Sequence, residues 1–441
     1  MQLKQKAWSL AHDPRAMLGA IRPLVVVSRA KLPVISSNKH MTIKTLISIL
    51  AVASLALVSA VNAAQYGPGV TDTEIKIGQT MPYSGPISAQ GVMTGKTMQV
   101  YFDKVNDDGG INGRKIKLIS LDDGYSPPKT VEQTRKLVEQ DDVLLIFGTL
   151  GTPTNLATRK YLNLKNVPQL FITTGVTKFG EPKAFPWTMA WIPNFSIEAG
   201  AYAAHILKVK PNAKIGILYQ NDDYGKDLVA GLKRGLGDKA QQLIVAEASY
   251  EVTDPTVDQQ IIALQGANAD TLMIFSTSKA AAQAIRKVYD IGWKPLTFIN
   301  TPANSIDVTL KPAGLDKSIG LISVTYGKDP GDPQWADDAG VRSYLAFMKK
   351  YYPDAEPGER NTLIAYNEAM TLAAVLKQCG NDLTRENVMR QAANLKDLEL
   401  PMLLPGIKIN TSPTDYYPVE QVQLTRFDGT RWVRFGEMFG R

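Results

Sequence analysis

The stretch that decides the fold is Val143-Leu144-Leu145-Ile146-Phe147, followed by Gly148-Thr149-Leu150-Gly151-Thr152-Pro153-Thr154-Asn155. The first five residues are apolar and typical of a buried strand. The following loop opens a helix, for which we predict Thr152 as the N-cap and Pro153 as the first helical residue. Because free backbone N–H groups at a helix start attract anions, this loop indicates a site for a small anionic ligand.

A second loop of the same kind, Thr173-Thr174-Gly175-Val176-Thr177, follows the next predicted strand, residues 169–172. Threonine hydroxyls can donate or accept hydrogen bonds, so they can orient a bound anion. Two hydroxyl-rich loops at neighbouring strand ends therefore predict a small polar cradle.

The residues from Met41 onward have the pattern of an export signal. Lys44 supplies a charged start, residues 46–60 are almost wholly apolar, and Val61-Asn62-Ala63 is an acceptable cleavage site. The apolar run is shorter than the roughly 20 residues that span a membrane. We therefore predict that residues 1–63 are an N-terminal extension and signal peptide, cleaved near Ala63, and that the mature protein is periplasmic. A permanent N-terminal anchor is the alternative.

Removing this leader changes the charge of the protein. The whole chain holds 49 basic and 42 acidic residues, and residues 1–63 hold eight of the basic ones and one of the acidic ones. The mature part thus has 49 − 8 = 41 basic and 42 − 1 = 41 acidic residues. This balance gives no reason to expect nucleic acid as a partner. Cys379 is the single cysteine, so the sequence offers neither an intrachain disulfide nor the cleavage-site cysteine of a lipoprotein.

Strand-like and helix-like segments alternate along the mature chain, which predicts a mostly parallel sheet with helices on both faces. The alternation breaks at residues 185–194 and then restarts at the helical segment 196–209. A second α/β domain is the simplest explanation. Residues 419–424 and 429–433 predict a terminal β-hairpin.

The sequence also argues against catalysis. Gly91-Val92-Met93-Thr94-Gly95-Lys96-Thr97 imitates a phosphate-binding loop but is one residue too short between its glycines. His205 is the only histidine after the leader, and it lies on an amphipathic helical segment where a structural role fits better. The acidic pairs Asp122-Asp123 and Asp222-Asp223 lack the spacing and the His or Cys partners of a metal site. We therefore expect that the protein is not an enzyme and that it binds neither a cofactor nor a metal ion.

Three segments together carry a family resemblance. They are Ile77-Gly78-Gln79-Thr80-Met81-Pro82-Tyr83-Ser84-Gly85-Pro86, Gly109-Gly110-Ile111-Asn112-Gly113, and the turn Asp222-Asp223-Tyr224-Gly225. Because these three segments follow one another in the family's order, the mature chain resembles the exported solute-binding proteins of ABC importers, in the branched-chain amino-acid-binding branch. The resemblance implies an α/β fold of two doubly wound, Rossmann-like lobes joined by three crossover strands, the type I periplasmic-binding fold. Lobe 1 would comprise residues 70–191 and 326–400, and lobe 2 residues 192–325 and 401–441.

The same resemblance implies how such a protein works. A ligand that contacts both lobes favours the closed state of a hinge. The closed, monomeric protein would then be recognised by the permease subunits of an ABC importer. A ligand sensor that hands its closed form to a membrane receptor is an alternative that the sequence does not separate from transport.

The resemblance also assigns site residues, position by position. Thr152 would place its hydroxyl on a ligand carboxylate, Gly175 and Thr177 would hold the same head group, and Tyr224 would close over the ligand. Two family aromatics align with Gln90 and Thr277, and a family carboxylate aligns with Pro302. The full predicted set is Gln90, Leu150, Gly151, Thr152, Thr174, Gly175, Thr177, Tyr224, Thr277, Pro302 and Tyr326.

Pro302 decides the predicted ligand. Family members that bind amino acids use the acid at this position for the ligand ammonium, and a buried ammonium without a counter-charge costs several kcal/mol. Unless Asp222, Asp223 or another acid substitutes, we predict a carboxylic acid without an amine, with aromatic acids ahead of fatty or dicarboxylic ones. A branched-chain or other amino acid remains the alternative. Trp187, Trp191, Tyr224 and Tyr326 would either flank the ligand or pack in the core.

Overall fold

The computed structural model describes residues 64–440 of the 441-residue chain. The predicted signal peptide and its cleavage site at Ala63 lie outside the described residues. In the described part, the helices are too short or too polar for any of them to cross a membrane.

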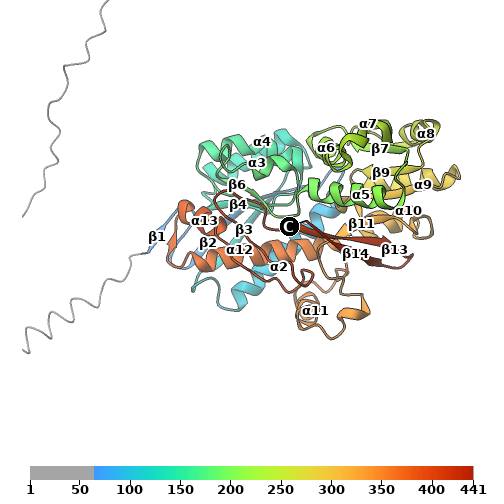
Figure 1. The fold of residues 1–441 in the computed structure, drawn as a ribbon. Coiled ribbons are helices and arrows are strands. Elements are labelled where there is room, and N and C mark those ends of the chain that lie inside the picture. The colour runs from blue at the N-terminus through green and yellow to red at the C-terminus, as the bar shows by residue number, and fades with distance from the viewer. Residues whose placement is uncertain (1–63, 441) are drawn as a thin grey trace, which may run out of the picture. The chain divides into compact units, whose positions relative to one another are not determined.

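The first lobe is built on a five-stranded parallel sheet (Figure 1). Three helices connect its first four strands along the chain: α2 (Ser88–Asp107), α3 (Pro127–Glu139) and α4 (Thr152–Leu164). A short 3-10 turn, η1 (Thr177–Gly180), follows the fourth strand. In spatial order the strands are β3 (Lys115–Asp122), β2 (Glu74–Met81), β4 (Leu145–Phe147), β5 (Gln169–Ile172) and β6 (Thr188–Ala190).

The second lobe is built on a seven-stranded sheet that is parallel except at one edge. In spatial order its strands are β14 (Trp432–Gly440), β13 (Gln421–Phe427), β11 (Ile322–Thr325), β10 (Leu296–Ile299), β9 (Thr271–Phe275), β7 (Ile215–Gln220) and β8 (Ile244–Tyr250). β13 pairs antiparallel with both β11 and β14, so the predicted terminal hairpin is confirmed.

Helices and short turns connect these strands. The longer helices are α5 (Phe195–Val209), α6 (Asp223–Leu236), α8 (Asp258–Gly266) and α9 (Ser278–Asp290). All five residues of β9 are buried, as expected for a central parallel strand that is covered on both faces. The shorter elements are η2 (Gly237–Lys239), α7 (Ala240–Leu243), η3 (Thr301–Ala303), η4 (Ile306–Leu310), α10 (Lys311–Ala313), η5 (Asp316–Ser318) and η6 (Pro333–Trp335).

The chain then returns to the first lobe through α11 (Ala339–Tyr351), α12 (Arg360–Gln378) and α13 (Arg385–Ala392). α12 packs along α2, and Tyr366 meets Tyr101 and Phe347 with ring centroids 5.2 and 5.0 Å apart. A two-stranded parallel pair, β1 (Gln65–Tyr66) with β12 (Asp382–Leu383), ties the first described residues to this helical return. The α/β class and the doubly wound arrangement predicted from sequence are confirmed.

Three passages of chain connect the lobes. The first follows β6 and enters α5, where Phe195 N donates to Gly175 O at 2.7 Å. The second and third run side by side, because Lys328 N donates to Met402 O at 2.8 Å and Leu404 N donates to Tyr326 O at 2.9 Å. The largest cluster of buried apolar residues includes members of both sheets. The exact residue bounds of the two lobes therefore remain a prediction.

Candidate ligand-binding site

A pocket lies where loops of both lobes meet, and we call it the cleft pocket. The first lobe contributes the loops after β4 and β5, and the second lobe contributes the start of α6 and the loops after β9 and β10. Ligands of open α/β sheets bind at these carboxyl ends of the strands. The lining residues are Ile87, Gln90, Tyr125, Leu150, Gly151, Thr152, Thr173, Thr174, Ile192, Phe195, Tyr224, Thr277, Pro302, Arg360, Asn361 and Ile364.

Most of the predicted site residues come together here. The eight that line the cleft pocket are Gln90, Leu150, Gly151, Thr152, Thr174, Tyr224, Thr277 and Pro302. The other three, Gly175, Thr177 and Tyr326, are not among its lining residues. Contact between any of these side chains and a ligand remains a prediction.

The start of α4 differs by one residue from the prediction. Gly151 is the N-cap, so Thr152 is the first helical residue and Pro153 the second. Gly151 has a φ of 108°, a conformation that favours glycine, and a Cβ there would lie 2.5 Å from the ring of Tyr125. The prediction was wrong because capping preferences were weighed without this close approach. As a result, the hydroxyl of Thr152 is not used as a cap.

The two hydroxyl-rich loops meet at a pair of threonines. The hydroxyls of Thr152 and Thr174 lie 2.7 Å apart, and both side chains are buried. Only one proton lies between the two oxygens, so the pair keeps one further donor for an anion in the pocket. The cradle predicted from sequence is thus present between Thr152 and Thr174, and not between Thr152 and Thr177.

Replacing Thr152 with valine is expected to weaken ligand binding by roughly 1–3 kcal/mol, because it leaves buried polar groups unpaired. Isothermal titration calorimetry measures this change. Thr158→Val is the matched control, since Thr158 is equally buried on α4 but does not line the pocket, and its hydroxyl donates to Asn155 O and accepts from Gln169. Equal affinity for Thr152→Val and the unmodified protein would remove Thr152 from the site.

The second-lobe wall is formed by buried polar contacts. The hydroxyl of Tyr224 donates to Ser276 O at 2.8 Å and accepts from Asn300, and burial raises its pKa well above the ordinary value. Its ring meets Phe195 edge-on, with centroids 5.5 Å apart. Gln90 reaches across from α2, and its Nε2 donates to Ser278 Oγ at 2.9 Å and Pro302 O at 3.1 Å. The lobes are therefore in direct contact beside the pocket.

Arg360 is the functional candidate that sequence reasoning missed. It is the first residue of α12, it is half-buried, and it is the one charged side chain that lines the cleft pocket. Its Nη2 atom is buried without a hydrogen-bond partner among the described residues. Such an atom requires an acceptor, and a carboxylate fits a guanidinium best. No local sequence signal marks Arg360, because it lies about 200 residues from the loops that it faces.

The buried acids near the pocket already have partners. Glu198 accepts from Thr301 N and Thr301 Oγ1, each at 2.7 Å. Asp222 caps α6 by accepting from Tyr224 N and Gly225 N, and it also accepts from Gln220. Neither carboxylate is among the residues that line the pocket. Asp223, the third acid considered from sequence, is ion-paired with Lys178.

Glu368 is the exception among these acids. It is fully buried on α12, its Oε2 accepts from Thr173, and its Oε1 has no partner among the described residues. Burial raises the pKa of Glu368 well above its usual range, against the opposing effects of Thr173 and Arg360. A raised pKa disfavours the charged form of this carboxyl group, and so disfavours its use as a counter-charge for a ligand ammonium.

The four aromatics considered from sequence divide between the pockets and the core. Trp191 is fully buried, and its Nε1 donates to Thr371 Oγ1 at 2.9 Å, so it is a core residue. Trp187 packs against the edge of the same core near Pro186 and Tyr416, away from the cleft pocket. Tyr326 lines a neighbouring pocket instead. Of the four aromatics proposed from sequence, Tyr224 alone lines the cleft pocket.

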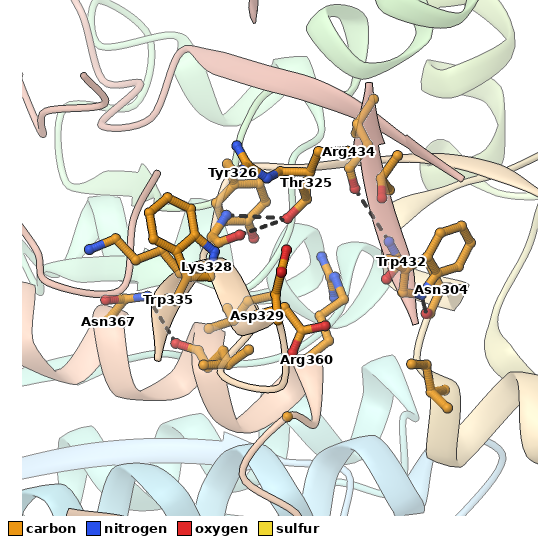
Figure 2. A pocket seen from close by; sticks show the side chains of 18 residues that line it. Asn304, Thr325, Tyr326, Lys328, Asp329, Trp335, Arg360, Asn367, Trp432 and Arg434 are labelled. Carbon is orange, nitrogen blue, oxygen red and sulfur yellow. Dashed lines mark hydrogen bonds between the residues drawn. The ribbon is translucent and has the colours of Figure 1, made fainter. Parts of the chain in front are cut away.

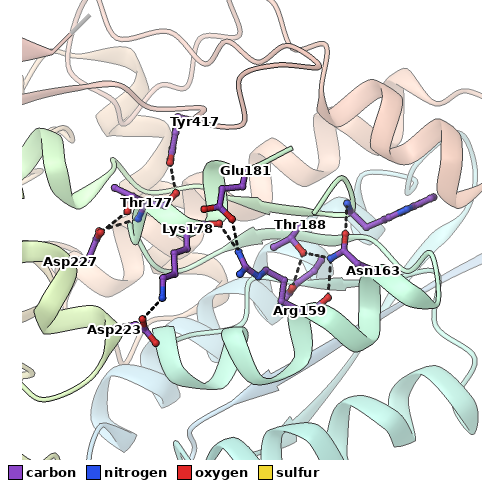
Figure 3. Close-up of polar contacts among 11 residues, drawn as sticks. Arg159, Asn163, Thr177, Lys178, Glu181, Thr188, Asp223, Asp227 and Tyr417 are labelled. Carbon is purple, nitrogen blue, oxygen red and sulfur yellow. Dashed lines mark hydrogen bonds and ion pairs between the residues drawn. The ribbon is translucent and has the colours of Figure 1, made fainter. Parts of the chain in front are cut away.

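Gly175 and Thr177 support the contact between the lobes. Gly175 lies against Phe195, where a Cβ would be 2.8 Å from the ring. Figure 3 shows Thr177 facing α6: its N donates to Asp227 Oδ2 at 3.0 Å, and its hydroxyl donates to Asp227 Oδ1. Lys178 and Asp223 form an ion pair beside it, and Tyr417 Oη donates to Thr177 O. We call this contact of Thr177 and Lys178 with Asp227 and Asp223 the rim contact.

Replacing Asp227 with alanine is expected to lower the affinity for every ligand about tenfold, because both hydrogen bonds of its carboxylate with Thr177 favour contact between the lobes. Asp223→Ala is the matched control. Its half-exposed ion pair with Lys178 is of a kind that contributes at most about 1 kcal/mol. Calorimetry gives the affinities, and small-angle X-ray scattering reports lobe opening. A ligand-selective loss in Asp227→Ala would contradict a role in closure.

His205 and the acidic pairs show no catalytic arrangement. His205 lies between the rings of Phe298 and Phe435, with centroids 6.1 and 5.3 Å away, and burial lowers its pKa. Within residues 64–440, no group of three or more His, Cys, Asp or Glu side chains is placed to hold a metal ion.

These features define a class: a two-lobed α/β protein with a pocket between its lobes. Comparison with known sequences gives the family. Residues 74–431 match the family described as periplasmic binding protein, and the chain belongs to that family. The members of this family are binding proteins, and the resemblance proposed from sequence is confirmed.

Individual relatives are distant but extend over most of the chain. Leu/Ile/Val-binding protein homolog 7 of Brucella suis is 22% identical over 346 residues, which is 76% of this chain and 84% of the relative. A branched-chain amino acid ABC transporter protein of Thermus thermophilus, solved with bound valine, has a TM-score of 0.76 at 15% identity and covers 84% of this chain and 98% of its own. A fatty acid ABC transporter substrate-binding protein of Thermomonospora curvata has a TM-score of 0.71 at 22% identity, with coverages of 86% and 96%.

Proposed function

We propose that this protein is the periplasmic solute-binding component of an ABC importer and that its ligand is a small organic carboxylate without an amine. Arg360 carries the proposal. Its buried, unpartnered Nη2 requires an acceptor, and the hydroxyls of Thr152 and Thr174 belong to the same pocket. A carboxylate would satisfy both, because it accepts charge-assisted hydrogen bonds from the guanidinium and from a threonine hydroxyl.

The charges around the pocket favour an acid over an amino acid. Among the described residues that line the cleft pocket, none is acidic, and Pro302 stands where the family's amino-acid binders have a carboxylate. The apolar side chains of Ile87, Ile192 and Ile364 and the ring of Tyr224 suit an aromatic or aliphatic body. We place aromatic acids first, ahead of fatty and dicarboxylic ones. The Thermomonospora protein is described as a fatty acid binder, so this fold accommodates acids without an amine.

Delivery to a transporter follows from the proposed closure. The rim contact and Gln90 both join the lobes, so a ligand held between the lobes would favour the closed state. Permease subunits would recognise that state. The predicted signal peptide supports a periplasmic location. We expect the protein to act as a monomer.

A branched-chain amino acid is the second candidate. The Brucella relative is named for Leu/Ile/Val binding, and the Thermus structure contains valine. In this case Glu368 is the residue to test, because its Oε1 is unpartnered behind Thr173. An ammonium near Thr173 would lower the pKa of Glu368 and pair with its carboxylate.

One screen separates the two candidates. Thermal shift followed by calorimetry would compare benzoate, 3-phenylpropanoate, hexanoate and succinate with leucine and valine. We expect the acids without an amine to bind and the amino acids to bind at least tenfold more weakly. Tight binding of leucine or valine that is lost in Glu368→Gln would establish the amino-acid alternative.

A further inference from the structure

A second pocket adjoins the cleft pocket, and we call it the hinge pocket (Figure 2). Both pockets include Arg360 and Ile364 in their linings, so these two side chains separate them. The hinge pocket lies beside the second crossover, which contributes Tyr326, and beside the terminal hairpin, which contributes Trp432. Like the cleft pocket, the hinge pocket is therefore bounded by residues of both lobes.

The hinge pocket gathers unsatisfied polar atoms. Within residues 64–440, ten buried side-chain nitrogen or oxygen atoms have no hydrogen-bond partner, and five of these belong to residues that line this pocket. Arg360 contributes one of the five, and the other four belong to residues that are at least 95% buried. Unpaired polar atoms are rare in protein interiors, so such a concentration points to a bound polar group. The five atoms are Asn304 Oδ1, Tyr326 Oη, Arg360 Nη2, Asn367 Oδ1 and Thr425 Oγ1.

The side-chain amides of Asn304 and Asn367 determine whether the bound polar group must be a hydrogen-bond donor or an acceptor. The Nδ2 of Asn304 donates to Ser323 Oγ at 3.0 Å and to Val324 O at 3.3 Å, and the Nδ2 of Asn367 donates to Leu363 O at 3.0 Å. Backbone carbonyls only accept, so neither amide can turn over without losing a bond. Each Oδ1 is therefore a free acceptor that lacks a donor among the described residues, and a ligand that offers a donor fits it.

The charges of the hinge pocket are almost balanced. Lys328 Nζ pairs with Asp338 at 2.8 Å, Arg434 donates to Gln423 Oε1 at 2.9 Å, and Asp332 pairs with Arg431. The lining holds three cations, Lys328, Arg360 and Arg434, and two acids, Asp329 and Asp332. A ligand carboxylate bound to Arg360 therefore brings the net charge of the lining and the ligand together to zero. A further charged group would then have no counter-charge.

We propose that the hinge pocket is a second compartment of the binding site, which takes a neutral hydrogen-bond donor, a hydroxyl or primary amide, at the far end of an organic acid. The inference rests on the proposed function, because Arg360 holds the carboxylate of that acid. Trp335, Trp432 and the ring of Tyr326 wall the compartment. The donor bonds Asn367 Oδ1, which lies on α12 together with Arg360. The substrate class is thus a hydroxylated or amidated carboxylic acid.

Matched acids test the compartment in the full-length mature protein. Calorimetry would compare hexanoate with 6-hydroxyhexanoate, adipate and 6-aminohexanoate, and 3-phenylpropanoate with 3-(4-hydroxyphenyl)propanoate. We expect the hydroxylated acid of each series to bind at least about fivefold more tightly than its parent, which is the effect of one net hydrogen bond. Adipate and 6-aminohexanoate should both bind more weakly than 6-hydroxyhexanoate.

Two variants locate the effect. Asn367→Leu removes the acceptor, keeps a branched side chain and does not weaken the helix, and it should abolish the advantage of the hydroxylated acids over their parents. Tyr326→Phe removes a hydroxyl that lies beside Arg360 and has no well-formed hydrogen bond among the described residues, and it should reduce the same advantage. Tyr366→Phe is the control, because Tyr366 is buried but lines neither pocket.

The possible outcomes separate the two proposals. Equal affinity for hydroxylated and parent acids, or an advantage that survives Asn367→Leu and Tyr326→Phe, would overturn the compartment while the carboxylate function stands. Tighter binding of 6-aminohexanoate or adipate than of 6-hydroxyhexanoate would overturn the neutral-donor class. If no acid in either series binds, the proposed function itself is wrong.

Discussion

Replacing Arg360 with glutamine is expected to weaken the binding of a carboxylate ligand about 100-fold, because the hydrogen bonds of a buried charge contribute up to about 3 kcal/mol. Glutamine keeps part of the length and one donor group but removes the positive charge. Calorimetry with the tightest acid from the screen gives the dissociation constant. Arg360→Lys should recover only part of the loss, because an ammonium cannot bind a carboxylate in the bidentate way that a guanidinium can.

Arg342→Gln is the matched control for charge removal. Arg342 is a largely exposed residue of α11 whose ion pair with Asp337 is at the surface, so its replacement should change affinity less than twofold. If Arg360→Gln binds the acid as tightly as the unmodified protein, the carboxylate lies elsewhere. The proposed function and the further inference would then both fail.

Replacing Trp191 with alanine is expected to lower the free energy of unfolding by about 3–5 kcal/mol, the usual cost of removing a large buried aromatic side chain. Trp191 is fully buried on the first crossover, its ring centroid lies 6.2 Å from that of Tyr326, and its indole N–H is hydrogen-bonded to Thr371. Urea unfolding followed by circular dichroism measures the change. The preference among organic acids should stay the same.

Trp187→Ala provides the comparison. Trp187 is only half-buried at the edge of the core, so its replacement should cost clearly less stability than that of Trp191. If Trp191→Ala has the same free energy of unfolding as the unmodified protein but a different preference among the acids, Trp191 contacts the ligand. That result would contradict its assignment to the core.

The fold was largely predictable because its signals are local. The apolar run that contains Leu145–Phe147, the next strand Gln169–Ile172 and the alternation after Phe195 all reflect side-chain patterns within a few residues of each other. The terminal hairpin was also predicted, from two β-rich runs around Gly429. The start of α4 was placed one residue too late, since the decisive contact of Gly151 is with Tyr125, which lies in another loop.

The site was predictable where it follows directly from strand ends. Thr152, Thr174, Tyr224 and Pro302 line the cleft pocket because the loops after parallel strands share one edge of each sheet. Thr177 belongs to a similar loop, yet it faces Asp227 of the other lobe. The sequence pattern cannot distinguish a hydroxyl that faces a pocket from one that bonds a neighbouring helix.

The sequence alone thus determined the α/β class and the two hydroxyl-rich loops, because both depend on residues that lie close together in the chain. It also shows a proline, Pro302, at the position where the family resemblance implies an acid. Tertiary structure alone decided that Arg360 faces those loops, that Trp191 is core, and that five unpaired polar atoms surround one hinge pocket. These facts depend on how the helical return through α12 packs along α2 and against β5. A charge at the start of a helix acquires its role only from the distant segments that surround it.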